Sequence, residues 1–181
     1  MERLDKPLMK YTFNQLYHSD LQRCRGGYER KLLKYLRHCQ TTQNKFLLLY
    51  YRWRFAMVKK KRGIEIYGLS DIGPGLYLGH TYNITINPNA IIGKNCNIHK
   101  GVTIGQENRG KRKGTPTIGD CVWIGVNSTI VGNITIGDDV LIAANSYVNC
   151  DVPSHSIVFG NPCQIKPREN ATEGYINNRC N

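Results

Sequence analysis

Aliphatic side chains recur every six residues between Ile66 and Val148. The series slips by two residues after Leu78, and a loop interrupts it before Ile118. Its members are Ile66, Ile72, Leu78, Ile86, Ile92, Ile98, Ile104, Ile118, Ile124, Ile130, Ile136, Ile142 and Val148. An α-helix has a shorter period and a half-buried strand alternates at every second residue, so neither explains this spacing. A fixed repeat of this length predicts a solenoid.

The six-residue repeat is typical of a parallel β-helix, in which each hexad supplies one short strand and one turn. Three hexads make a triangular coil, with the branched residue pointing to the axis and a following glycine easing the turn. The repeats predict about four coils, and at ~4.8 Å per coil the prism is ~20 Å tall. A β-sandwich would instead alternate with a period of two and show turn residues at intervals of about eight to twelve. We therefore expect a mainly β fold over residues 63–165.

Three further segments lack the repeat. Residues 105–117 contain Gly, Lys and Arg without an apolar anchor, so they should leave the prism as an excursion loop. Residues 153–165 should cover the open end of the solenoid, and the polar tail, 166–181, is expected to be loose. Residues 1–62 form a basic N-terminal segment with helical spacing over 19–23, 28–39 and 45–61.

The positive charge of the chain is confined to its N-terminal segment. Residues 1–63 hold sixteen Lys and Arg against four Asp and Glu, whereas the remaining residues are balanced at nine against nine. One interpretation is a helical cap that packs on the prism and helps it to trimerise. Another is docking on an anionic membrane surface, because the basic residues 59–62 follow an apolar, aromatic stretch. Nucleic-acid binding is the third, but no recognition motif supports it.

Cysteine use and the absence of a secretory pattern indicate a reducing cytoplasm. The seven cysteines are scattered, without a C-x-x-C pair or zinc-like spacing. The N-terminus lacks the apolar core of a signal peptide, and the most apolar run is short and interrupted by Arg52 and Arg54. We expect a cytoplasmic protein, with the inner face of the membrane as the alternative location.

Four stretches together resemble the serine acetyltransferases and their relatives that O-acetylate sugars of surface polysaccharides. They are GIEIYGLSDIGPGLYLGH at 63–80, NCNIHKGVTIG at 95–105, TPTIGDCVWIGVNSTIVGNITIG at 115–137 and DVPSHSIVFGNP at 151–162. The resemblance covers about residues 45–165 and is specific as a set. It implies a left-handed β-helix, homotrimers with active sites in the clefts between neighbouring prisms, and acetyl-CoA as the acyl donor.

The resemblance places a catalytic base at His80 and its orienting acid at Glu65. In the family, the histidine closes the motif G-I-D-I-H-P-G-A-x-I-G-x-G-x-x-L-D-H, and an aspartate lies fifteen residues before it; here Glu takes that place. A neutral imidazole can take the proton of an attacking hydroxyl, and a carboxylate on its other nitrogen fixes the tautomer. Asp71 is the rival partner of His80, and we expect a structural role for His99.

The donor site is predicted with less detail. By resemblance, backbone groups around Gly105, Gln106, Val126 and Ala144 line the groove for the pantetheine arm, and an N–H there could stabilise the oxyanion. The phosphates of CoA have candidate partners in Lys113, with Lys111 and Arg112, and in Lys166 and Arg168. We expect no metal, because a γ-type carbonic anhydrase would need three histidine ligands, typically including an H-x4-H pair that this chain lacks.

Two departures from the serine acetyltransferases concern the acceptor. Gly79 stands where they carry Asp, and residues 113–116 read Lys-Gly-Thr-Pro in place of Asp-Arg-His-Pro. The groups expected to hold the charges of an amino acid are then missing, which favours a saccharide acceptor. Serine is the alternative acceptor. The opposing class is a non-catalytic β-helix scaffold, which would have no reason to bind acetyl-CoA.

Overall fold

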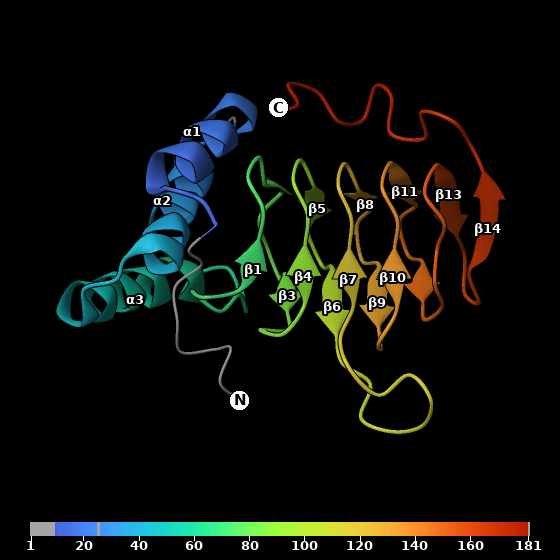
Figure 1. Cartoon of the computed structure of the whole chain (residues 1–181), viewed down its shortest axis with the longest axis horizontal. Helices are drawn as coiled ribbons and strands as arrows, with labels where there is room; N and C mark the ends of the chain where they lie inside the picture. Colours follow the sequence, from blue (N-terminus) through green and yellow to red (C-terminus); the bar gives the residue numbers. More distant parts are fainter. Residues whose placement is uncertain (1–9, 25, 181) are drawn as a thin grey trace.

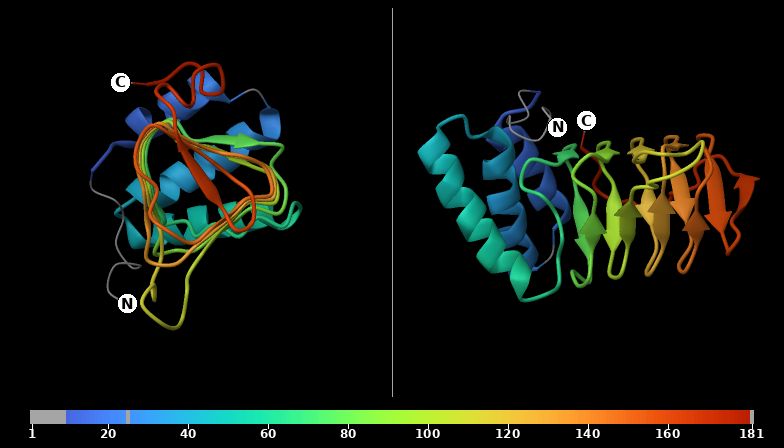
Figure 2. Two further views of the ribbon diagram at one scale, coloured as in Figure 1. Left: turned by 90° about the vertical axis from the view of Figure 1, so that its right-hand side faces the viewer. Right: turned by 90° about the horizontal axis from the view of Figure 1, so that it is seen from below.

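The computed structural model describes residues 10–24 and 26–180, and its strands form the three faces of a triangular prism (Figures 1 and 2). The faces have the strand orders β1-β4-β7-β10, β14-β13-β11-β8-β5-β2 and β12-β9-β6-β3. The strands are β1 (Asp71–Ile72), β2 (Tyr77–Gly79), β3 (Thr85–Ile86), β4 (Ile91–Ile92), β5 (Asn97–His99), β6 (Thr103–Gly105), β7 (Thr117–Ile118), β8 (Trp123–Ile124), β9 (Thr129–Val131), β10 (Thr135–Ile136), β11 (Val140–Ile142), β12 (Tyr147–Val148), β13 (Ser156–Phe159) and β14 (Gln164–Pro167). The predicted left-handed parallel β-helix is confirmed.

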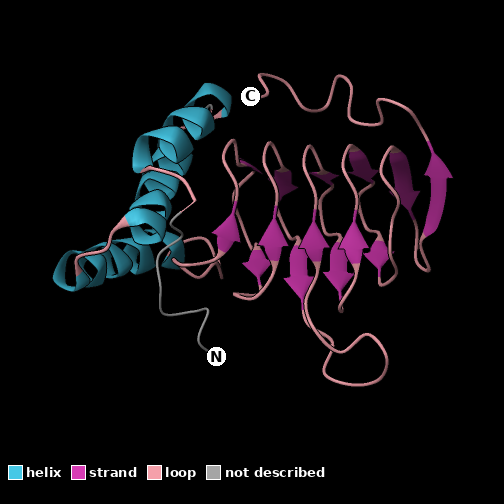
Figure 3. Ribbon diagram, viewed as in Figure 1, coloured by secondary structure: helices cyan, strands magenta, loops and turns pink. Residues whose placement is uncertain are grey.

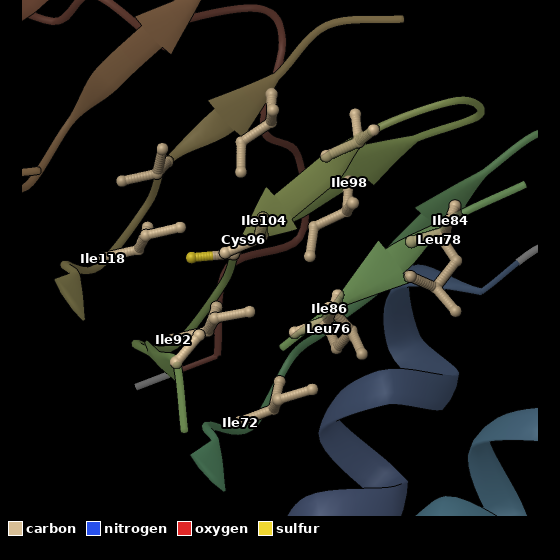
Figure 4. Packing of buried hydrophobic residues seen from close by; sticks show 14 of the residues in the cluster. Ile72, Leu76, Leu78, Ile84, Ile86, Ile92, Cys96, Ile98, Ile104 and Ile118 are labelled. Atoms are coloured by element: carbon tan, nitrogen blue, oxygen red, sulfur yellow. The ribbon is translucent and has the colours of Figure 1, made fainter. Parts of the chain in front are cut away.

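The six-residue series stacks into three columns inside the prism (Figure 4). One column runs through Leu78, Ile98, Ile124 and Ile142, which pair in register from β2 to β11. The other columns are Ile72, Ile92, Ile118, Ile136 and Ile86, Ile104, Ile130, Val148. All twelve side chains are buried. Each contributes about 1.5–3 kcal/mol by leaving water, so the columns are the main source of stability of the prism.

Two interruptions of the repeat lie where the sequence predicts them. Residues 106–116, between β6 and β7, leave the prism as a loop, closed at its base by the backbone pair Glu107 and Gly114 (Figure 1). The two-residue slip lies between β2 and β3: Gly79 pairs with His99 twenty residues later, whereas Thr85 pairs with Thr103 eighteen residues later. The corner after β2 therefore contains two residues more than the corner after β5.

Three helices cover the N-terminal end of the prism (Figure 3). They are α1 (Phe13–Arg23), α2 (Gly27–Thr41) and α3 (Lys45–Lys60). α1 begins earlier than the stretch 19–23 expected from spacing, because Thr12 and Gln15 form a capping box at its start. Asn44 caps α3 by accepting hydrogen bonds from the backbone N–H groups of Phe46 and Leu47. No helix in the described part of the chain combines the length and apolarity needed to cross a bilayer.

A fully buried ion pair joins these helices to the first coil. Arg37 of α2 donates to both carboxylate oxygens of Asp20 in α1, at 2.7 and 2.9 Å. The same guanidinium donates to the carbonyls of Ile72 and Gly73, and Asp20 accepts from the N–H of Leu76. The first coil has no preceding coil to pair with, so its backbone groups would otherwise be unsatisfied. The two charged side chains supply the hydrogen bonds that a preceding coil would otherwise make.

The C-terminal end is closed by β14, the edge strand of its face, which pairs antiparallel with β13. The expectation of a loose tail is wrong. After β14 the chain runs back along the prism to α1 (Figure 1), where the carbonyl of Asn177 accepts a hydrogen bond from Arg23. Asp139 holds it midway by accepting from the Ala171 and Thr172 amides and from the Thr172 hydroxyl. Thr172 is completely buried.

Candidate functional site

His80 lies at the enlarged corner after β2. Its side chain is exposed, and its backbone is in the left-handed region, with φ of 51°. In the next coils the left-handed residues at this corner are Gly101, Asn127 and Asn145, which the register places one position later. The displaced turn follows from the two extra residues, and it presents the imidazole to solvent. Left-handed residues recur at the corners of this prism, so the conformation belongs to the turn; what distinguishes residue 80 from its counterparts at this corner is that its side chain is an exposed imidazole.

The corner is held by the helical segment. Glu29 of α2 accepts hydrogen bonds from the hydroxyl of the buried Thr81, at 2.9 Å, and from Arg62, at 3.4 Å. The Arg62 guanidinium lies 4.6 Å from the centre of the Tyr82 ring. These groups bound a pocket of about 520 Å³ around His80, lined by Cys24, Gly26, Glu29, Arg62, Tyr77, Leu78, His80, Tyr82 and Lys100.

The pocket contains three neighbours of His80 that the sequence does not reveal: Glu29, Arg62 and Lys100. The first two come from the helical segment, outside the repeat, and no local motif connects them with residue 80. Tyr82 gave the one usable signal, since it is a bulky residue at the point where the register slips. The helical segment is therefore part of the site as well as a cap.

Two of the predicted donor residues share the corner with His80. The register aligns His80 with Lys100, Val126 and Ala144 on successive coils. The carbonyl of Val126 accepts the N–H of Asn145, and the carbonyl of Lys100 accepts the N–H of Asn127. A ligand that extends along the prism axis from His80 would pass these residues in turn.

Glu65 lies on a neighbouring face and away from His80. It pairs with Thr85, five residues after His80; three of these follow from the eighteen-residue coil and two from the enlarged corner. Among the described residues, no hydrogen bond joins the Glu65 carboxylate to the His80 imidazole; the Thr85 hydroxyl donates to Glu65 at 3.4 Å. The single chain thus does not form the expected dyad. Asp71, the rival partner, lies on β1 in a different sheet from β2.

Gly105 lines the pocket that contains Glu65. This pocket of about 420 Å³ is lined by Lys59, Glu65, Ile66, Tyr67, Thr85, Ile86, Asn87, Pro88, Ile104 and Gly105. Gln106 follows at its edge, where its side-chain oxygen accepts a hydrogen bond from Asn87 at 3.2 Å. The predicted donor residues therefore divide between two faces of the prism.

The predicted phosphate partners lie far from His80. Lys113 is exposed on the excursion loop. Lys166 is on β14, with its ammonium 5.4 Å from the centre of the Phe159 ring, and the N–H of Arg168 donates to the carbonyl of His155. β14 is five strands from β2 in its sheet, which corresponds to about 24 Å at ~4.8 Å per step. Lys100, beside His80, is the nearer cation.

Gly79 has a packing role that the sequence did not reveal. A Cβ at this position would lie 2.4 Å from Cδ2 of the His99 ring. His99 is held there because its Nδ1–H donates to the carbonyl of Ile124 at 3.0 Å, and its ring packs against Trp123. Burial, together with the nearby His80, lowers the pKa of His99. The glycine makes room for the ring, so its presence need not reflect the acceptor.

Residues 10–24 and 26–180 contain no group of three or more His, Cys, Asp or Glu side chains that could hold a metal ion. The cysteines in the described part of the chain are free thiols.

Comparison with known proteins places the repeat in a known class. Residues 115–150 match the family model of the bacterial transferase hexapeptide (six repeats). The chain is 41% identical over 103 residues to serine acetyltransferase 2 of Arabidopsis thaliana, covering 57% of this chain and 32% of that protein. It is 42% identical over 107 residues to a serine acetyltransferase of Staphylococcus epidermidis, covering 59% and 50%. The chain thus spans about a third to a half of these relatives.

Solved structures of serine acetyltransferases are also similar to this chain. Soybean serine acetyltransferase aligns with a TM-score of 0.61 at 30% identity, over 77% of this chain and 56% of that one. The Neisseria gonorrhoeae serine acetyltransferase in complex with serine gives 0.60 at 32% identity, over 77% and 55%. Serine acetyltransferase isoform 3 of Entamoeba histolytica, in complex with cysteine, gives 0.69 at 26% identity, over 90% and 63%.

These comparisons correct the prediction of a saccharide acceptor in polysaccharide biosynthesis. The relatives and the structures are serine acetyltransferases, whereas the saccharide prediction depended on two departures in the sequence. One of these, Gly79, is explained by the packing of His99. The chain thus resembles serine acetyltransferases over its β-helix and contains the hexapeptide repeat of bacterial transferases.

Proposed function

We propose that the protein is an acetyl-CoA-dependent serine O-acetyltransferase. The observation that carries this proposal is the exposed His80, held in a left-handed turn at the mouth of a pocket, in a chain that resembles serine acetyltransferases. An imidazole that is solvent-accessible and held at its backbone can meet a hydroxyl without reorganising the corner.

His80 acts as the general base. It accepts the proton of the serine hydroxyl while that oxygen attacks the carbonyl carbon of the thioester. The new C–O bond forms, the C–S bond breaks, and the proton passes to the departing CoA thiolate, giving O-acetylserine and CoA. Proton transfer of this kind contributes typically ~10²–10⁴-fold to the rate.

The donor extends along the corner from His80, past Lys100, Val126 and Ala144. Lys100 is the cation nearest to His80 in this column and can neutralise a phosphate or the oxyanion. Lys113, Lys166 and Arg168 bind the CoA phosphates only if the donor extends along the prism to them or if they belong to a neighbouring subunit.

The active assembly is a homotrimer in the cytoplasm, where acetyl-CoA is present and thiols stay reduced. The two pockets that hold His80 and Glu65 lie on adjacent faces of one prism. A neighbouring prism packed at that edge would close both into one cleft. Because one chain keeps Glu65 away from its own His80, the carboxylate that orients the imidazole in this cleft comes from Glu65 of the neighbouring prism, and serine binds there too.

The test is turnover of acetyl-CoA with a panel of acceptors: L-serine, D-serine, L-threonine, nucleotide sugars and oligosaccharides. Thiol release and mass spectrometry report the products. We expect release with L-serine that is stoichiometric with O-acetylserine. A folded protein that binds acetyl-CoA but acetylates none of these hydroxyls would overturn the proposal, and so would one that binds no acetyl-CoA at all.

A further inference from the structure

α3 presents apolar side chains on two opposite sides. On its inner side Leu48, Tyr51, Phe55 and Val58 pack against the core. On its outer side a second set of large apolar residues is exposed: Phe46 (85%), Leu47 (44%), Leu49 (62%), Tyr50 (46%), Trp53 (58%) and Met57 (57%). α3 is the outermost helix at its end of the molecule (Figure 2). The outer set is therefore not part of the fold's own core.

The outer residues form a continuous stripe. Phe46, Leu49, Tyr50, Trp53 and Met57 follow the three- and four-residue spacing of one helical face. Isolated apolar residues on a surface need no explanation, but a contiguous exposed patch of this size marks an interaction surface. Trp and Tyr are suited to a boundary between water and lipid, because each combines an apolar ring with a polar N–H or O–H group.

The charge around the stripe is of one sign. Between Glu29 and Glu65 the sequence has no acidic residue and eleven Lys and Arg. On α3 itself and just after it, Lys45, Arg52, Lys60 and Lys61 are exposed. Such a surface fits a partner that is apolar inside and negatively charged at its face.

A groove between α2 and α3 also combines apolar side chains with cations, and its size suits one lipid headgroup. It has a volume of about 340 Å³ and is lined by Tyr28, Lys31, Trp53, Arg54, Met57, Val58 and Lys61. Its walls are mainly apolar, and three cations lie around them. Arg54 is fixed in place, since it donates to the Tyr35 hydroxyl at 2.8 Å and lies over the Tyr35 ring. Apolar walls with a ring of cations suit an anionic phospholipid, with its phosphate at the cations and its glycerol and upper acyl region on the walls.

We propose that the outer face of α3, with this groove, docks on an anionic lipid bilayer. An interfacial helix of this type buries its apolar face at the level of the headgroups, and nearby cations add electrostatic attraction. A two-fold pair of copies fits less well, because it would bring Lys31, Arg54 and Lys61 against their own counterparts. A three-fold contact would set the stripe against a different surface of the next copy, and sedimentation tests that case below. The inference does not depend on the proposed acetyl transfer.

The experiment is flotation of the full chain with vesicles of phosphatidylglycerol and phosphatidylcholine in equal parts, compared with phosphatidylcholine alone. We expect the chain to float with the anionic vesicles and not with the neutral ones. The chain has two tryptophans, so in the Trp123→Phe variant the fluorescence of Trp53 alone should shift to the blue on binding. Phe46→Ser with Trp53→Ser should weaken binding by ~10-fold or more, and Lys31→Gln with Lys61→Gln should do so too.

Two matched controls separate a local surface from general stickiness. Tyr147→Ser removes an exposed aromatic residue from β12, and Arg109→Gln with Lys111→Gln removes the same charge from the excursion loop. Both should leave flotation unchanged. The proposal would be overturned if the anionic vesicles failed to float the chain, or if the controls weakened flotation as much as the α3 variants. It would also fail if the Phe46 and Trp53 changes lowered the sedimentation coefficient without vesicles, because the stripe would then bind a second copy.

Discussion

The β-helix and the helical segment are stabilised in different ways. In the β-helix, stacked Ile, Leu and Val side chains form columns along the axis, and each coil satisfies the backbone of the next. In the helical segment, buried apolar residues such as Leu36 and Phe55 join the same core, and Asp20 and Arg37 in addition bind the backbone of the first coil. Repetition stabilises the interior of a solenoid, but its first coil needs specific polar partners.

This difference bears on function because His80 lies at the enlarged corner after β2, where the two regions meet. Its corner is built from the solenoid, but Thr81 beside it is held by Glu29 of α2. A solenoid alone would leave this corner without its inner support. The helical segment therefore contributes to the geometry of the site.

The largest effect on stability is expected at Arg37. Arg37→Met removes the guanidinium and leaves the Asp20 carboxylate buried without its ion pair, which should cost about 3–5 kcal/mol of unfolding free energy. Urea denaturation measures it. The double variant Asp20→Asn with Arg37→Met should recover part of the loss. Arg52→Met, an exposed arginine on α3, is the control, and equal losses for Arg37 and Arg52 would show that the buried pair does not seat the helices.

A core substitution in the solenoid should lower the free energy of unfolding about as much as Arg37→Met, but its effect should stay within the neighbouring coils. Ile98→Ala opens a cavity in the middle column and should cost about 2–5 kcal/mol. Val131→Ala, at a half-buried position on β9, should cost clearly less. Hydrogen exchange should show the Ile98 loss centred on neighbouring coils. If exchange rose equally in α1 and α2, the two regions would be one cooperative unit and the contrast between them would be wrong.

Glu29 tests whether the helical segment supports the site. Glu29→Gln weakens the hydrogen bond from Thr81, and we expect it to lower kcat by ~3–10-fold, because small displacements of a catalytic group are costly. KM should be unchanged, and the pH profile of kcat should keep its shape, since His80 remains the base. Glu173→Gln, on the exposed tail, is the matched control. Unchanged kcat in Glu29→Gln would remove the helical segment from the account of the site.

The smallest expected effect is the pH dependence of tail docking. Partial burial opposes ionisation of Asp139, but hydrogen bonds from Thr172, His155 and Ala171 prevail and hold its pKa below the ordinary value of 3.8. Its contribution is present above 3.8 and is lost as the pH falls through the lowered pKa. The hydrogen bond to Asp139 and the nearby Glu169 carboxylate raise the pKa of His155 above 6.5. Asp139 and His155 both belong to the prism, so the link of His155 to the tail is its ion pair with Glu169, at 3.6 Å. That contribution is present below 6.5 and is lost as the pH rises through the raised value.

Docking should therefore be strongest between about pH 4 and 6.5. Hydrogen exchange at the Ala171 and Thr172 amides, corrected for intrinsic rates, measures it. Thr172→Val should expose both amides and reduce the dependence at acid pH. Protection that stayed constant from pH 3 to 8 would mean that the Asp139 contacts do not hold the tail.

How much could be predicted from the sequence differs between the two regions for a physical reason. The columns through Leu78 and Ile98 follow from a repeat, so fold, register and excursion loop were all predictable. The Asp20–Arg37 pair and the Asp139 clasp join residues far apart in sequence, so no periodicity reveals them. For the site, the register slip in the sequence marks the corner where His80 lies. The distance of Glu65 from His80 in the single chain follows from the eighteen-residue coil and the enlarged corner together. Gly79 was misread because its neighbour His99 belongs to the next coil.

The most direct test of the central claim is the turnover number of His80→Asn with L-serine and acetyl-CoA. Asparagine can keep the left-handed turn, so the fold and the binding of acetyl-CoA should be retained. Without a base we expect kcat to fall by ~10²-fold or more. A folded His80→Asn protein that acetylates serine at the rate of the parent would contradict the account, because the exposed imidazole would then have no part in the chemistry.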